Sequence, residues 1–349
     1  MVAMHSITRD NEVHNARIRW GLCTLATCAL MGCALGAARS DNSDEAPSQA
    51  AASPASPASP ASPAGAPSLY VVDAANTLQS FDADGNSLRK FQFNPQVGTL
   101  SGGLTLFSGN VYATSVKGEG AELTSRVFAY DATTLKQVRL HLGAFTVPAD
   151  SGAPVSAGAY HAIVYNPVTD RFYVASDRLG LLVFDRLGAY IPSTSASAAK
   201  AAPVSALAYD STQHALWAIV DRHTVKFGDD GSGPLPGIAP LGAQYRHGRG
   251  AVALAFCPAG GLAVAFGEPR LGPHSDGSGR TYDSGGQPIG ASYAGKIVNA
   301  HAMSCSARGE IFIAADNGLL QYTVQGAQVE SHAYAQQLTA PILGVLAAN

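Results

Sequence analysis

The sequence predicts an all-β fold, a six-bladed β-propeller spanning residues 68–349, and three observations support this prediction. A short turn motif recurs six times along the chain, at intervals of 40 to 55 residues. A short run of alternating β-type residues precedes each copy. No stretch shows sustained helical periodicity with capping residues. Repeats of about 45 residues that hold four strands are typical of propeller blades.

The recurring turn motif begins with an aromatic residue, often continues with Asp, and places Gly or another turn residue four positions after the aromatic. An Asp side chain can accept hydrogen bonds within a turn, and Gly adopts positive φ without strain. We therefore predict six hairpin turns, which begin at Phe81, Tyr130, Phe184, Phe227, Tyr282 and Tyr322.

Each repeat is predicted to contain strands A, B and C, followed by a weaker strand D. The clearest runs are the B strands, rich in aromatic and β-branched residues. They cover residues 69–72, 111–114, 172–175, 216–219, 262–265 and 311–314. A further run precedes several of them as strand A, at residues 160–165, 204–209 and 252–256.

The two ends of the repeat region complement each other. The first repeat begins at strand B with Leu69 and has no strand A of its own. The last residues, 340–347, are similar to the strand A run at 202–208. We therefore expect the C-terminal strand to complete the first blade, which would leave no exposed sheet edge. The long second repeat reaches about residue 158, so seven blades are the alternative.

The cadence of an aromatic-rich strand followed by Phe-Asp-x-x-Gly resembles that of NHL, YVTN and SMP-30-like propeller repeats. The resemblance covers nearly all of residues 68–349 and implies a propeller fold. SMP-30-like lactonases hold a divalent metal near the channel, but no residue of this chain matches their ligand set position by position.

The N-terminal segment, residues 1–32, is predicted to be a lipoprotein-type signal peptide. Arg9, Arg17 and Arg19 precede an apolar stretch of 13 residues at 20–32, shorter than the roughly 20 residues that span a bilayer. Leu30-Met31-Gly32-Cys33 resembles the bacterial lipobox, which implies lipid attachment at Cys33. Met31 departs from the small or β-branched residue usual there, so the alternative is ordinary cleavage after residue 37 or 38.

Two further features place the protein in the cell envelope. Ala34 follows Cys33, and by resemblance to Gram-negative lipoproteins this implies the outer membrane, with the domain facing the periplasm or the cell surface. Residues 33–67 are rich in Ala, Ser and Pro and repeat Ser-Pro-Ala. Such a segment cannot bury a core, and we expect a disordered, extended tether.

Composition limits the classes of partner and chemistry. Charged residues are 13% of the chain, the net charge is −3 and no basic run occurs, so nucleic acid is not an expected partner. Contact with a membrane is expected only through the lipid anchor. Gly-x-Ser-x-Gly, His-Glu-x-x-His and phosphate-binding loops are absent from the sequence. No catalytic residues and no cofactor are therefore predicted.

The loops after the B strands form the candidate binding mouth, because ligands of propellers usually bind where such loops surround the channel. An acidic residue ends strand B in five of the six repeats. These acids have two interpretations: they accept backbone N–H groups in a tight turn, or they line a ligand site. The candidate residues are Asp73, Asp177, Arg178, Asp221, Arg222, His223, Glu268, Arg270, Asp316 and Asn317.

Two pairs of residues outside this set require interpretation. His161 and His301 begin two A strands, but alignment from strand B puts them one position out of register. Such an offset reverses the facing direction, so we expect structural histidines. Cys257 and Cys305 lie in similar turns of neighbouring repeats. Stacked sheets are about 10 Å apart, whereas disulfides span Cα separations of about 4.4–6.8 Å, so we expect free thiols.

The sequence thus favours an exported, lipid-anchored propeller that acts as a binding or scaffold module for an envelope protein, peptide or glycan. The alternative is a metal-dependent propeller hydrolase or lactonase, which would need a divalent cation. Fold alone does not choose between them.

The lipid anchor yields a direct test. Metabolic labelling with a radioactive or clickable fatty acid should mark the wild-type protein, and Cys33→Ala should abolish the label, because the thiol is the acylated group. Cys28→Ala is the matched control, and this variant should keep the fatty-acid label. Undiminished label in Cys33→Ala would contradict the anchor.

Overall fold

The computed structural model describes a folded domain that begins just before the first repeat. The chain divides into two units, Met1–Ser59 and Pro60–Asn349, and all described residues lie in the second. They are residues 65–148, 158–192, 202–235, 250–258, 261–267, 276–283, 285–293, 297–329, 337–338 and 341–348. The predicted signal peptide, Cys33 and most of the tether lie outside them. Within these ranges, no helix is long and apolar enough to cross a membrane.

The described residues form six antiparallel sheets, which confirms the all-β prediction. Their one named helical element is a 3₁₀ turn at Gly120–Glu122. The first sheet contains β22 (Ile342–Ala347), β1 (Leu69–Asp73), β2 (Thr77–Phe81) and β3 (Ser87–Gln92). The second contains β4 (Thr99–Phe107), β5 (Asn110–Lys117), β6 (Thr124–Asp131) and β7 (Gln137–Val138).

The other four sheets continue in chain order. The third contains β8 (Tyr160–Asn166), β9 (Arg171–Ser176) and β10 (Gly180–Asp185). The fourth contains β11 (Val204–Asp210), β12 (Ala215–Val220) and β13 (His223–Gly228). The fifth contains β14 (Gly250–Cys257), β15 (Gly261–Gly267), β16 (Asp276–Tyr282) and β17 (Pro288–Ile289), and β18 (Ile297–Val298) also pairs with β16. The sixth contains β19 (Ala300–Cys305), β20 (Glu310–Ala315) and β21 (Gly318–Thr323).

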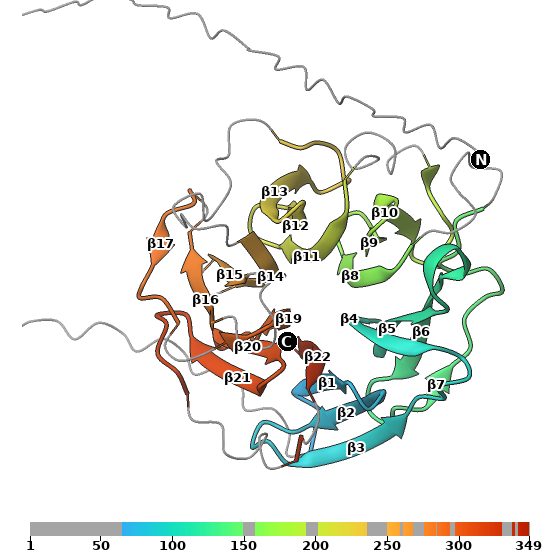
Figure 1. The fold of residues 1–349 in the computed structure, drawn as a ribbon, viewed down its shortest axis with the longest axis horizontal. Coiled ribbons are helices and arrows are strands. Elements are labelled where there is room, and N and C mark those ends of the chain that lie inside the picture. The colour runs from blue at the N-terminus through green and yellow to red at the C-terminus, as the bar shows by residue number, and fades with distance from the viewer. Residues whose placement is uncertain are drawn as a thin grey trace, which may run out of the picture. The chain divides into compact units, whose positions relative to one another are not determined.

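The sheets follow one another around a common centre (Figure 1). The innermost strands β22, β4, β8, β11, β14 and β19 each contact the next in this order, and β19 contacts β22. Each predicted B strand falls within the second strand of its sheet. Strand D is weak in the second, third, fifth and sixth sheets, where it is two residues long or a single bridge. In the first sheet, β3 departs from the prediction with six residues. The predicted C-terminal strand is confirmed, because β22 pairs antiparallel with β1.

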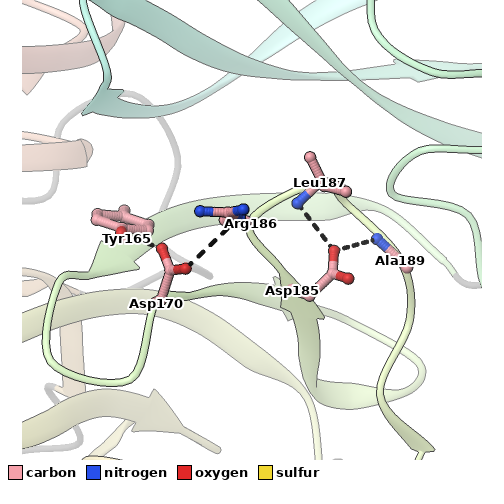
Figure 2. Close-up of polar contacts among 6 residues, drawn as sticks. All are labelled: Tyr165, Asp170, Asp185, Arg186, Leu187 and Ala189. Atoms are coloured by element: carbon pink, nitrogen blue, oxygen red, sulfur yellow. Dashed lines mark hydrogen bonds and ion pairs between the residues drawn. The ribbon is translucent and has the colours of Figure 1, made fainter.

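The recurring motif forms the hairpin turn after the third strand of each sheet, and Figure 2 shows one copy. Asp185 Oδ1 accepts the N–H groups of Leu187 and Ala189, both at 2.8 Å. The Gly188 N–H donates to the Asp185 carbonyl at 2.9 Å, with φ of 84° at Gly188. Positive φ at this position is the reason that the motif favours Gly. The turn prediction is therefore confirmed down to its hydrogen bonds.

The turn aromatic of each sheet is buried against the preceding sheet. Tyr130 lies in one apolar cluster with Tyr70 and Leu78 of the first sheet. Phe81 of the first sheet lies in another with Phe312 and Leu319 of the sixth. Six such clusters each join two consecutive sheets. Burial of one large apolar side chain contributes roughly 1.5–3 kcal/mol, so these interfaces hold the sheets together.

The prediction of free thiols is wrong, because Cys257 and Cys305 form a disulfide with a Cα–Cα separation of 5.1 Å. Cys257 ends β14 and Cys305 ends β19, two innermost strands that contact each other. The spacing of about 10 Å applies to sheets stacked face to face. Here the sheets converge toward the centre, and their innermost strands come within disulfide reach.

The disulfide should contribute measurably to stability. It closes a loop of 48 residues, and loops of this size are expected to stabilise a fold by about 2–4 kcal/mol. Cys257→Ser/Cys305→Ser should lower the free energy of urea unfolding by that amount. A reducing agent should lower the free energy of unfolding of the wild type by a similar amount and should not change that of the double variant. Equal unfolding midpoints for both proteins without reductant would contradict this expectation.

Candidate functional site

The innermost strands share a β-bulge near the start of each strand. In β8 the pairing with β9 shifts between Tyr160 and Ala162, and in β19 the pairing with β20 shifts between Ala300 and Ala302. Equivalent shifts occur in β11, β14 and β22, and a longer one in β4. A bulge adds one residue to one strand and thereby changes which face the next side chains occupy.

This bulge corrects the prediction that His161 and His301 face away from the channel. Each is the extra residue of its bulge, and both line a cavity together with residues of the other innermost strands. The one-residue offset seen in the sequence was therefore real. It marked an inserted bulge residue, because the strand returns to its regular pairing register directly after the bulge.

The central cavity is narrow, at about 50 Å³, which leaves room for about one or two water molecules. All six innermost strands contribute to its lining, and seven of the fifteen lining residues are Gly, Ala or Ser. At Gly344 of β22, an added Cβ would lie 2.2 Å from the carbonyl oxygen of Gly102 on β4. Only glycine allows these two strands to approach so closely. A ligand larger than a few atoms would therefore have to bind at the mouth.

One side of the mouth holds a hydrogen-bonded group centred on Asp316. Its Oδ1 lies 2.7 Å from His301 Nε2, and its Oδ2 accepts a hydrogen bond from Asn299 Nδ2 at 2.6 Å. The neighbouring Asn317 Oδ1 accepts the Val298 N–H at 3.1 Å. Burial raises the pKa of Asp316, but the hydrogen bonds from His301 and Asn299 outweigh it, so the net pKa is lowered. Asp316 is accordingly an anion at neutral pH.

His161 lies on the other side of the channel. The order of the innermost strands places β8 three positions from β19 in either direction around the centre. Although part of His161 is exposed to solvent, the channel lining desolvates its imidazole and lowers the pKa of His161, and the Asp177 carboxylate partly opposes this effect. The imidazole is therefore neutral at pH 7 and can both donate and accept a hydrogen bond.

Most of the predicted mouth residues form hydrogen bonds within or between loops. Asp73 is buried and accepts the Thr77 N–H at 2.9 Å, while Asp177 accepts the Ala159 N–H at 2.8 Å. The Asp73 contact, four residues along the chain, agrees with the interpretation of these acids as turn acceptors. Asp177 instead accepts from a residue 18 positions earlier in the chain and joins two separate segments of its sheet. Arg178 donates to the Gly120 carbonyl of the second sheet at 2.6 Å.

The remaining predicted residues have mixed outcomes. Arg222 donates to the Gly267 carbonyl of the fifth sheet at 3.1 Å. Asp221 and His223 are exposed, with His223 Nδ1 lying 2.8 Å from the Asp221 carbonyl oxygen. Glu268 and Arg270 lie outside the described residues.

Sequence reasoning missed Ser205 and Asn299. Ser205 is the bulge residue of β11, is exposed and lines the same cavity as the two histidines. Asn299 adopts φ of 48° just before β19. The sequence did contain one indication of the role of Ser205: it directly precedes an Ala near the start of strand A, as His161 and His301 do. Among the described ranges, no group of three or more His, Cys, Asp or Glu side chains is arranged to hold a metal ion.

The comparisons with known proteins show the fold class. No protein-family model matches the sequence, and no curated protein matches it either. Among solved structures, a chain from "Crystal structure of Nidogen/Laminin Complex" matches with a TM-score of 0.57 at 9% identity, covering 81% of this chain and 98% of that one. A chain from "Crystal Structure of Mitotic Checkpoint Complex" has a TM-score of 0.44 at 12% identity, covering 70% and 67%. The first similarity shows that this domain has a fold of the β-propeller type.

The lowered pKa of Asp316 gives a pH-dependent expectation. A carboxyl group whose pKa is lower in the folded state stabilises the fold above its unfolded pKa of about 3.9, and the contribution is lost as pH falls through the folded pKa. Asp316→Asn should therefore be less stable than the wild type at pH 6, with a difference that shrinks toward pH 3. Urea unfolding at both pH values measures this. A difference that does not change with pH would contradict it.

Proposed function

We propose that this protein is an exported, lipid-anchored β-propeller that serves as a binding or scaffold module in the cell envelope. Its six sheets are the six blades, β22 closes the first blade, and the rim of the channel binds the partner. The observation that carries the proposal is the disulfide between β14 and β19 in a domain that follows a lipobox-like segment.

The sheet contacts support closure with six blades. One of the six apolar clusters joins the last sheet to the first, through Phe81, Phe312 and Val345. The β22–β1 pairing joins the two ends of the folded region within one sheet. A seventh blade would need four further strands in residues 139–159, between β7 and β8, and this interval is shorter than one repeat.

The disulfide supports export independently of the N-terminal segment. Disulfides persist in oxidising compartments such as the periplasm and are rare in the cytosol. Cys257 and Cys305 are the two cysteines of the repeat region, and they are paired with each other. Export explains this pairing, and the lipobox-like segment ending at Cys33 supplies the route.

The geometry of the channel supports binding at the rim. A cavity of about 50 Å³ is too small for a substrate of ordinary size. The rim presents the exposed residues His161, Ser205, Asp221, His223 and His301. Such a polar surface suits a protein, peptide or glycan. The similar chain in the nidogen–laminin structure belongs to a protein complex, which fits a fold that accepts protein partners.

The His301–Asp316 pair favours a second candidate, a metal-dependent hydrolase. The imidazole and the carboxylate lie 2.7 Å apart at the channel, and both are metal-ligand types. Metal analysis of the purified full chain tests this candidate. Stoichiometric zinc or calcium, lost in His301→Ala, would favour it over the binding module.

Site-specific photocrosslinking in intact cells tests the binding module. A photoreactive amino acid at His223, on the proposed rim, should give one discrete adduct with an envelope component. The same amino acid at Arg89, exposed on the outer strand β3, is the control and should not give that adduct. Excess unlabelled protein should compete for the adduct. Identical adducts from both positions, or none from either, would overturn the rim as the binding surface.

A further inference from the structure

A second cavity lies at the end of the domain opposite the channel rim. Its volume is about 230 Å³, and it opens between the fourth and fifth sheets. Its lining includes Asp210 at the end of β11, Thr212 after β11, Pro258 after β14 and Asp283 after β16. These positions follow the first and third strands of their sheets. The proposed rim is formed by the connections that follow the second and fourth strands. In antiparallel sheets the two sets of connections lie at opposite ends.

In two of the six sheets a tyrosine hydroxyl bridges the space that the groove occupies here. Tyr70 and Tyr173 occupy the second position of their B strands, and each hydroxyl reaches the hairpin turn of the next sheet. Tyr70 donates to the Ala132 carbonyl at 2.8 Å, and Tyr173 donates to the Asp229 carbonyl at 2.6 Å. The fourth sheet has Trp217 at this position. The indole makes no such bond with the described part of the fifth sheet, and the groove remains beside it.

The walls of the groove are largely apolar, and two acids, Asp210 and Asp283, are also part of its lining. Trp217, Phe256, Leu262 and Ile289 provide the walls. No Arg, Lys or His is among the described lining residues. An apolar slot of this size suits one long side chain, since cavities for drug-sized ligands start near 300 Å³.

Each of the two carboxylates uses one oxygen for its own turn. Asp283 Oδ1 accepts the N–H groups of Gly285 and Gln287, at 2.9 and 2.8 Å. Asp210 Oδ1 accepts the Thr212 and Gln213 N–H groups, both at 2.9 Å. The Oδ2 atoms take no part in these contacts. Asp283 is exposed, so its second oxygen is accessible to a donor that enters the groove, whereas Asp210 is buried, with 4% of its surface exposed.

From this complementarity we propose that the groove binds an arginine side chain of a protein partner. The apolar stem packs along Phe256, Leu262 and Ile289, as the stems of long cationic side chains do elsewhere. The guanidinium donates to the second oxygens of Asp283 and Asp210. Arginine fits better than lysine because its planar head donates to two acceptors at once and is more weakly hydrated.

The Trp217 ring is not the cation site. The Lys226 ammonium already lies 5.5 Å from the ring centroid and is hydrogen-bonded to Gln213. A second cation over that ring would be repelled by it. Trp217 instead reports on the groove, because the chain has one other tryptophan, Trp20, in the N-terminal segment.

The test uses the full chain carrying Trp20→Phe, so that all tryptophan fluorescence comes from Trp217. The probes are n-propylguanidinium, which reproduces the arginine side chain, and n-propylurea, its neutral counterpart of equal shape. We expect a saturable fluorescence change with the guanidinium probe in the millimolar range, since it has few atoms. The urea probe should bind about tenfold more weakly. Equal binding of the two probes, or no response to either, would overturn the proposal.

Matched variants assign the effect to the groove. Asp283→Asn keeps a carbonyl acceptor for the turn and should weaken guanidinium binding about tenfold. Asp210→Asn is a second variant with the same expectation. Asp185→Asn changes the equivalent turn acid of the third sheet, away from the groove, and should bind as the wild type does. Thermal unfolding confirms that each variant is folded. Unchanged binding in folded Asp283→Asn, or equal loss in Asp185→Asn, would overturn the proposal.

Discussion

The convergence of the innermost strands is the constraint on which the rest of the structure depends. Where these strands contact one another, side chains must be small, as the close approach of Gly102 and Gly344 shows. Farther out the space widens, and the aromatic residues of the hairpin turns fill it, with Phe81, Tyr130 and Phe184 fully buried. The repeating sequence encodes this wedge shape: alanine and glycine in the first strand, an aromatic residue at the end of the third.

The same convergence determines which chemistry the centre can support. Six strands that meet closely leave a cavity of water size, so polar side chains can act only where the strands begin. The bulges occur at that level and turn His161, Ser205 and His301 inward. Asp316 then fixes the orientation of His301 through a hydrogen bond of 2.7 Å. A rim of this kind is preorganised by the backbone, because the bulge rather than a flexible loop aims each side chain.

The sequence predicted the sheets well and the site less well, for a physical reason. Alternation and turn chemistry are local, so the strands, the hairpin turns and the C-terminal strand were all predictable. Cys257–Cys305 pairing depends on how closely two sheets approach at one end, which no local pattern contains. The inferred facing direction of His161 and His301 was wrong, because a bulge changes the facing direction without changing composition. Asp73 was correctly suspected as a turn acceptor, since Asp in a tight turn accepts backbone N–H groups. Asp177 accepts a backbone N–H from a residue 18 positions away, which turn chemistry alone does not predict.

The way in which the chain enters the first sheet has a mechanical consequence. The Ser68 N–H donates to the Phe81 carbonyl, and the Ser68 carbonyl accepts the Ala348 N–H, both at 2.8 Å. Strand β1 is thus bonded on both sides, to β2 and to β22, from its first residues onward. Tension applied through the preceding segment would act along β1 and shear both ladders at once, so rupture requires many hydrogen bonds to break together. A domain pulled from its N-terminal end would therefore resist force at the strand through which the pull enters.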